Sequence, residues 1–259
     1  DLSTLLTSAY QNHAVFNSAG QAGTVVPIGT RATPVNNFPD AMTIADTLGI
    51  RRIQMATSGT LNGGTTATGK VFVGDNPTVD ILTIDTSAEV TDCSFENLSI
   101  LGTLDGNNMF KGCIISNINY VNGLLQECAI TGTISVDGTA QCNIINCWSG
   151  TAGVEDAQLV TIDMGGPGNS LALRNYAGGL RITNYAGGGA ITLDFASGRV
   201  IIDATCTGGT IGVRGICDVT DNSAATCTVL DQTIDSGLVI INDGVKKSSI
   251  LVPHTQNMN

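Results

Sequence analysis

The stretch that most constrains the fold is residues 171–223, where apolar and polar residues alternate and small turn residues interrupt the alternation at short intervals. The predicted apolar face contains Leu171, Leu173, Leu180, Ile182, Ile191, Leu193 and Phe195. The predicted polar face contains Arg174, Arg181, Thr183, Thr192 and Asp194. A period of two is typical of a half-buried strand. Glycine groups such as Gly178-Gly179 and Gly208-Gly209 supply the turns. The stretch therefore predicts short strands joined by tight turns.

A five-residue motif also repeats within this stretch. The sequence NYAGG occupies residues 175–179 and recurs at residues 184–188, nine positions later. A repeat this short predicts one strand and one turn per unit, stacked many times.

Part of the same stretch resembles a known group of proteins. Residues 178–223 contain GGLRITNYAGG, SGRVIID, CTGGTIGVRG and TDNS, and they resemble a repeat-rich segment of bacteriophage virion proteins such as fibres, spikes and capsid decorations. The resemblance covers about a fifth of the chain. It implies a homotrimer, because those proteins commonly assemble around a threefold axis. Short flat units with little aromatic core also gain from burying faces against other chains.

The composition agrees with a stacked β architecture. The 259 residues include 32 glycines, only 4% are aromatic and only 13% are charged, and the chain is long enough to bury a core. Many turns and flat layers can replace a bulky core in a β-solenoid. Disorder is the alternative for a chain of low charge, but 42% hydrophobic residues and a clear periodicity argue against it.

The net charge of −11 limits the partners. An acidic surface repels nucleic acid and anionic membranes, and it suits docking on a basic surface. We expect no membrane span, because no stretch approaches 18 consecutive apolar residues. Asp1 opens the chain with neither Met nor the features of a signal peptide, which predicts processing or the omission of an upstream piece.

Three segments are expected: an N-terminal arm over residues 1–22, a capping helix with a β-helix-like body over 23–164, and a short-repeat stacked β region with a C-terminal tail over 165–259. In the arm, Leu2, Leu5, Leu6 and Tyr10 can share one side of a short helix. The boundary before the last segment is placed at the GGPG sequence of residues 165–168.

The capping helix is predicted over residues 37–48. Asn37 can cap its first turn, Pro39 suits that turn and Gly49 suits its end. Its apolar face is predicted to contain Ala41, Ile44, Ala45 and Leu48. Residues 50–55 are expected as the first strand, whose open end the helix would cover. The pattern GT…PIGT…PVNNFPDAMTIA is similar to the opening segment of phage β-helical fibres and of pectate-lyase-like β-helices.

Apolar positions further along predict the walls of the body. The inward set over residues 56–89 is expected to be Val71, Val73, Val79, Ile81 and Ile84, and the other walls Leu98, Ile100, Leu101, Ile118, Leu124 and Leu125. Residues 228–241 predict two strands, Asp243-Gly244 a turn and residues 250–252 a last strand before a polar tail.

Eight cysteines recur at positions that suit stacked turns. Cys93, Cys113, Cys128 and Cys142 each open a Cys-x-apolar sequence, as Cys217 does later and Cys227 after it. Rungs of a right-handed parallel β-helix have about this spacing, so an internal ladder of buried thiols is expected. Disulfides between rungs or subunits are the alternative, with Cys142 and Cys147 as the nearest pair. No CxxC sequence points to a zinc ribbon or a thioredoxin-type site.

Few residues suggest catalysis. The two histidines, His13 and His254, lie near the ends of the chain, which argues against a catalytic triad or a His-rich metal site. Paired carboxylates, which phage tailspikes use to cleave polysaccharides, remain the other route. The glutamates are Glu89, Glu96, Glu127 and Glu155, and the closest carboxylate groupings are Asp92 with Glu96 and Glu155 with Asp156. We expect these to be solvated, and we assign no catalytic, cofactor-binding or metal-binding residue.

Aromatic residues give a similar interpretation. Trp148 stands alone as a candidate sugar platform, and no GGxGxD calcium turn is present. Tyr176 and Tyr185 occupy matched positions of the repeat, which predicts a structural tyrosine ladder rather than a sugar-binding surface.

These observations favour an all-β solenoid, similar to a right-handed parallel β-helix, with a short N-terminal capping helix. The resemblance implies a non-enzymatic structural protein on the exterior of a phage particle, assembled in the host cytoplasm, with itself and the major capsid protein as partners. A short chain without a recognisable receptor-binding tip favours capsid decoration over a fibre. The alternatives are a tail fibre or spike that binds host glycan, a polysaccharide depolymerase and a bacterial surface adhesin.

Overall fold

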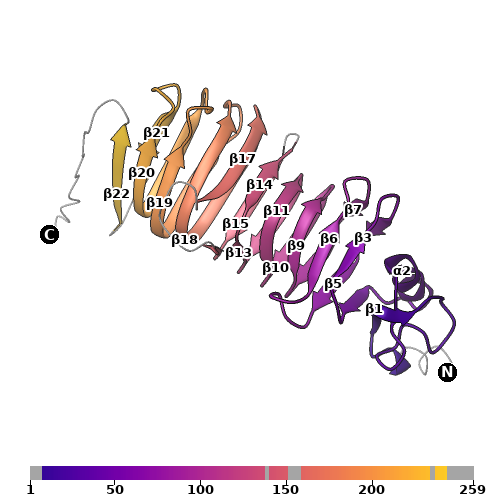
Figure 1. Ribbon diagram of the computed structural model, residues 1–259. Coiled ribbons are helices and arrows are strands. Elements are labelled where there is room, and N and C mark those ends of the chain that lie inside the picture. Colours follow the sequence, from indigo (N-terminus) through magenta and orange to yellow (C-terminus); the bar gives the residue numbers. More distant parts are fainter. Residues whose placement is uncertain (1–7, 138–139, 151–158, 234–236, 244–259) are drawn as a thin grey trace. The chain divides into compact units, whose positions relative to one another are not determined.

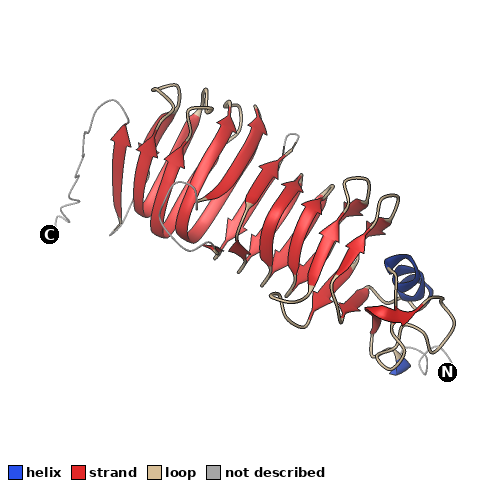
Figure 2. Ribbon diagram, in the orientation of Figure 1, coloured by secondary structure: helices blue, strands red, loops and turns tan. Residues whose placement is uncertain are grey.

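The computed structural model describes residues 8–137, 140–150, 159–233 and 237–243 (Figure 1). The protein is all-β, with 57% strand and 5% helix, and its parallel strands stack into a β-solenoid of about nine turns. Strands dominate the described chain in Figure 2. The predicted fold class is therefore confirmed. Within these residues no helix is both long and apolar enough to cross a membrane.

Contacts divide the chain into two compact units, residues 1–119 and residues 120–259, here called the first and second units. The three segments expected from the sequence remain a prediction. The elements of the first unit are β1 (His13–Gln21), α2 (Phe38–Thr47), β2 (Arg52–Met55), β3 (Gly59–Leu61), β4 (Thr66–Thr68), β5 (Val71–Gly74), β6 (Ile81–Ile84), β7 (Glu89–Thr91), β8 (Ser94–Glu96), β9 (Ser99–Thr103), β10 (Asn107–Lys111) and most of β11 (Ile114–Tyr120).

Helix α2 forms as its sequence predicts. The Asn37 side chain accepts a hydrogen bond of 2.8 Å from the backbone N–H of Asp40, and a proline occupies the first turn. Gly49 follows the helix with a φ of +65°, which a glycine adopts without strain. The helix buries Phe38, Ala41, Met42, Ile44 and Ala45, while Leu48 is only partly buried.

The strand expected over residues 50–55 is present as β2, but it is not the first strand of the chain. β1 precedes α2 and pairs in parallel with β2. The ring of Phe38 in α2 stacks on the ring of Phe16 in β1, with centroids 4.1 Å apart. The sequence of β1 concealed the strand because Ala14, Val15 and Phe16 are buried consecutively and do not alternate with polar residues.

Parallel ladders form three faces in the first unit. One runs through β1, β2, β5, β8 and β10, a second through β3, β6, β9 and β11, and a third joins β4 to β7. Inside the first ladder, Phe72 stacks on Phe95 at 5.5 Å and Phe95 on Phe110 at 5.0 Å. Phe38 meets Phe72 edge-on at 5.9 Å, so the helix continues this aromatic column.

Two residues of the predicted inward set point outward. Val79 is 62% exposed and Ile81 is 39% exposed, whereas Phe72 and Leu82 are fully buried. Val73 and Ile84 are buried as predicted, and Val71 is partly buried. Ile81 was misplaced because a change of one position moves a residue to the other face of a strand, and Val79 lies in the loop before β6. Of the other predicted wall residues, four are buried (Leu98, Ile100, Ile118 and Leu125) and two are partly buried (Leu101 and Leu124).

The second unit is also built of stacked parallel strands. Its strands are β12 (Asn122–Gln126), β13 (Ala129–Ile130), β14 (Thr133–Val136), β15 (Gln141–Ile145), β16 (Trp148–Ser149), β17 (Val160–Gly166), β18 (Ser170–Tyr185), β19 (Ile191–Ile202), β20 (Thr210–Asp221), β21 (Thr228–Asp231) and β22 (Leu238–Asp243). The two strands predicted over residues 228–241 correspond to β21 and β22. The expected turn at Gly244 and the strand over residues 250–252 lie outside the described residues.

The short repeat has a different meaning from the one predicted. Leu171 pairs with Ile191, and Ile191 pairs with Ile211, so one turn takes about twenty residues. The first NYAGG copy lies within β18, and the second begins at the last two residues of this strand, so the copies lie on two sides of a single turn. A nine-residue unit is therefore one side of a turn and not a complete turn. The prediction failed because alternation alone does not reveal whether the next apolar run lies beside the previous one or above it.

Candidate functional site

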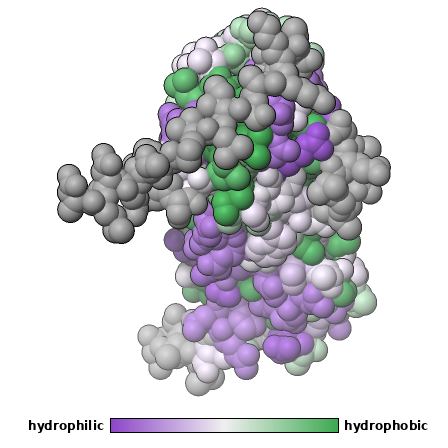
Figure 3. All heavy atoms as spheres, turned by 90° about the vertical axis from the view of Figure 1, so that its left-hand side faces the viewer, coloured by the Kyte–Doolittle hydropathy of each residue, from purple (hydrophilic) through white to green (hydrophobic). Residues whose placement is uncertain are grey.

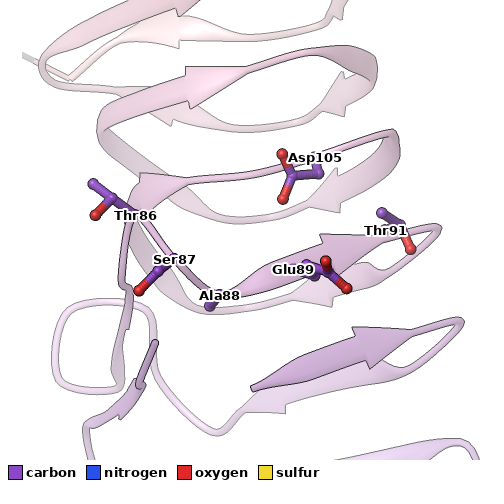
Figure 4. Close-up of a pocket in the computed structure, with 6 residues that line it drawn as sticks. All are labelled: Thr86, Ser87, Ala88, Glu89, Thr91 and Asp105. Atoms are coloured by element: carbon purple, nitrogen blue, oxygen red, sulfur yellow. The ribbon is translucent and has the colours of Figure 1, made fainter. Parts of the chain in front are cut away.

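An open depression of about 470 Å³ lies on the third face of the first unit. It is lined by Thr86, Ser87, Ala88, Glu89, Thr91 and Asp105 (Figure 4). Glu89 and Thr91 belong to β7, and the three residues before them form the turn that leads into this strand. Asp105 comes from the following turn, because its backbone N–H donates to the carbonyl oxygen of Val90 over 3.0 Å.

Asp85 holds the turn that borders the depression. Its Oδ1 accepts from the backbone N–H of Ser87 and from the hydroxyls of Thr86 and Ser87, each over 3.3 Å. The Ser87 N–H is the largest of the influences that lower the pKa of Asp85 below its ordinary value. Hydroxyl groups of β4 contact the lining residues of β7. Thr66 donates a hydrogen bond to Glu89 over 3.3 Å, and the Oγ1 atoms of Thr68 and Thr91 lie 3.2 Å apart.

The two carboxylates of the depression can accept hydrogen bonds from a ligand, and its hydroxyl groups can donate or accept them. That chemistry suits a ligand rich in hydroxyl groups, such as a saccharide. The sequence singled out Glu89 only as one of four glutamates and missed Asp105, because nothing in the sequence revealed that β4, β7 and residue 105 are neighbours.

The carboxylate groupings that the sequence suggested do not line this depression. Glu96 at the end of β8 forms an ion pair with Arg52 over 2.9 Å. Asp92 lies at the corner before β8, with a φ of 52°. Glu127 accepts from the side chain of Gln126 over 3.4 Å, and the pair Glu155 and Asp156 lies outside the described residues.

All eight cysteines are buried, and none of them is joined in a disulfide. Their burial confirms the expectation of apolar thiols, and no disulfide joins Cys142 to Cys147. Burial raises the pKa of the Cys142 thiol above its ordinary value and raises that of Cys206 to about 11. These thiols are therefore protonated and unreactive at neutral pH.

The eight thiols do not form one continuous ladder, and the predicted stacking holds for only some of them. Cys128 and Cys147 are neighbours on successive turns, and the Cys128 backbone N–H donates to the sulfur of Cys147 over 3.3 Å. Cys142 instead lies in another column, paired with Gly123 and Leu171. Cys93 and Cys113 precede strands of different faces, β8 and β11. The Cys-x-apolar sequence marks the start of an inward-facing strand, and several faces share that pattern.

The aromatic candidates have different environments. Tyr176 and Tyr185 are both buried, but they lie at two corners of one turn and do not form a ladder. Tyr176 packs edge-on against Phe195, with ring centroids 5.7 Å apart. Trp148 is 45% exposed on β16, so it remains available as a contact surface.

Within the described residues, no group of three or more His, Cys, Asp or Glu side chains is arranged to hold a metal ion. His13 lies in β1, and His254 is outside the described residues. The expectation of no metal and no cofactor remains a prediction. Comparisons with known protein families, curated proteins and solved structures found no match.

Proposed function

We propose that this chain is a non-enzymatic structural subunit of a bacteriophage particle, a homotrimer that decorates or stabilises the capsid exterior or forms a fibre. The resemblance of residues 178–223 to virion repeat segments is the observation that carries the proposal. Those residues include the second half of β18 and all of β19 and β20, which lie on three consecutive turns with apolar interiors. A stack held by continuous backbone hydrogen bonds and buried side chains suits a protein that must persist outside a cell. Its negative charge suits a basic docking surface on another virion protein.

Native mass measured by light scattering tests the proposal. We expect a mass near three times 26.6 kDa, both with and without reductant, because the eight thiols are buried and form no disulfide. A monomer under both conditions would contradict the homotrimer. A trimer that dissociates only in reductant would show that the cysteines link subunits.

The polar depression favours a second candidate function, the binding of host surface glycan. Wild-type protein would be tested on an array of bacterial surface polysaccharides, beside the double variant Glu89→Gln with Asp105→Asn. If the depression binds the glycan, the double variant should lose at least tenfold in affinity, whereas Glu127→Gln in the second unit should bind as wild type does. Binding that survives the double variant would exclude this depression as the site.

Cleavage of the polysaccharide is tested separately. A depolymerase would release reducing ends from a bound glycan, and its carboxylate variants would not. The variants are Glu89→Gln and Asp105→Asn for the depression, and Asp92→Asn and Glu96→Gln for the grouping expected from the sequence. If the wild type releases no reducing ends, the depolymerase alternative fails.

A further inference from the structure

A line of uncharged, outward-facing side chains follows the stacked turns of the second unit. This outer column consists of Ala129, Trp148, Ala177, Ser197, Ile216 and Leu238, each beside the next in the parallel ladders. Ser197 lies in a register shift between Phe195 and Gly198, and Ile216 is the residue opposite this shift, because Phe195 pairs with Gly215 and Gly198 pairs with Cys217.

Three large apolar side chains of the outer column reach the solvent. Trp148 is 45% exposed, Ile216 is 53% exposed and Leu238 is 44% exposed. Between Trp148 and Ile216 the column carries only the small side chains of Ala177 and Ser197. Figure 3 views the chain from the left-hand side of Figure 1, where green apolar surface lies between patches of purple polar surface. These are three of the nine large apolar side chains that are exposed among the described residues, and they share one line on the surface.

Charges of opposite sign flank this column on two successive turns. In β19, Asp194 precedes the column and Arg199 follows it; in β20, Arg214 precedes it and Asp218 follows it. Asp194 and Arg214 are neighbours and form an ion pair of 2.9 Å, and Arg199 is the neighbour of Asp218. Each turn therefore carries a negative charge on one side of the column and a positive charge on the other, and the order reverses between the turns.

This reversal makes the charges on one flank of the column complementary to the charges on the other flank of a second copy of the same chain. We call the side with Asp194 and Arg214 the leading flank of the column, and the side with Arg199 and Asp218 the trailing flank. When two copies lie side by side with parallel stacks at the same height, the leading flank of one copy faces the trailing flank of the other. Asp194 then faces Arg199 of the second copy, and Arg214 faces its Asp218. A shift by one turn would place Asp194 against the second copy's Asp218, two like charges.

We propose that the outer column is the surface through which copies of this chain associate, in parallel and in register. The inference rests on the homotrimer of the proposed function and identifies the contact that would form it. The apolar side chains supply the buried area, and the flanking charges select the height at which copies meet. Because the leading flank of each copy contacts the trailing flank of the next, the contact can close into a ring around an axis parallel to the stack.

Arginine substitutions in the outer column test this surface. Ile216→Arg and Leu238→Arg replace exposed side chains, so each variant should fold, which circular dichroism verifies. Light scattering should show that these variants are monomers at concentrations where the wild type is a trimer. Val79→Arg is the matched control, since Val79 is 62% exposed in the first unit, and it should leave the trimer intact.

Two further variants test the geometry. Ile216→Cys should give a disulfide-linked dimer band on a non-reducing gel after mild oxidation, because equivalent positions of neighbouring copies meet near the axis. Met109→Cys, at a position that is 49% exposed in the first unit, should not give that band. Arg199→Glu should weaken the trimer at least tenfold by opposing Asp194 of the next copy, whereas Arg199→Lys should retain it.

The outcomes separate this inference from the proposed function. A wild-type monomer would overturn the homotrimer and, with it, the outer column as its contact. A wild-type trimer that persists in both arginine variants and gives no cross-link through Ile216→Cys would overturn the outer column alone. If Val79→Arg dissociates the trimer and Ile216→Arg does not, the contact lies in the first unit instead.

Discussion

At the scale of single residues, the corners of the solenoid explain the NYAGG motif. Asn175 and Asn184 each adopt a positive φ, 53° and 55°, and the tyrosine that follows each of them turns into the core. The Asn175 amide donates to the Asn146 side chain on the previous turn over 3.0 Å, and Asn184 donates to Asp163 over 2.8 Å. Asparagine tolerates this backbone conformation and links successive turns with its side chain.

Substitution of Asn175 should separate these two roles. Asn175→Ala should destabilise the protein by about 1–2 kcal/mol, because alanine is strained at positive φ and the link to Asn146 is lost. Asn175→Gly keeps the backbone relaxed and should cost less than Asn175→Ala. Denaturant unfolding curves would measure the difference, and equal losses in both variants would contradict a backbone contribution.

The two motif tyrosines should respond in opposite ways to loss of their hydroxyl groups. The Tyr176 hydroxyl is buried without a hydrogen-bond partner among the described residues, whereas the Tyr185 hydroxyl donates to the Gly189 carbonyl over 2.7 Å. Tyr176→Phe should therefore stabilise the protein by about 1 kcal/mol, and Tyr185→Phe should destabilise it by about 1 kcal/mol. Thermal unfolding followed by circular dichroism would measure both. A lower melting temperature for Tyr176→Phe would indicate a partner for its hydroxyl.

At the scale of elements, α2 acts as an end cap of the first unit. It packs on β1 and β2, and Phe38 extends the aromatic column that begins inside the turns. Lys70, which is buried, pairs with Asp46 of α2 and ties the helix to the turn that carries β5. The helix therefore covers apolar side chains that water would otherwise reach.

Removal of the Phe38 ring tests the cap. Phe38→Ala should destabilise the protein by about 3–5 kcal/mol, because it leaves a cavity between Phe16 and Phe72. Thr43→Ala, on the exposed side of the same helix, is the matched control and should change stability by less than about 0.5 kcal/mol. Chemical denaturation would compare them. If both variants unfold at the wild-type midpoint, the helix does not stabilise the solenoid.

At the scale of the whole molecule, the thiols report on the integrity of the stack. All eight cysteines are buried, and burial raises the pKa of several of them. A thiol-specific reagent at pH 8 should therefore modify almost none of the eight in the native protein and all eight in guanidinium chloride. Rapid reaction of one or more native thiols would show that a turn opens readily.

The sequence by itself determined the fold class and the local chemistry of its elements. Period-two alternation with frequent glycines was enough to predict stacked strands, and Asn37, Pro39 and Gly49 were enough to predict the helix, since these signals act over a few neighbouring residues. Only the tertiary structure decided which residues become neighbours across turns. The turn length near Leu171, the outward position of Ile81 and the proximity of Glu89 to Asp105 depend on register between strands, which a repeating pattern satisfies in several ways.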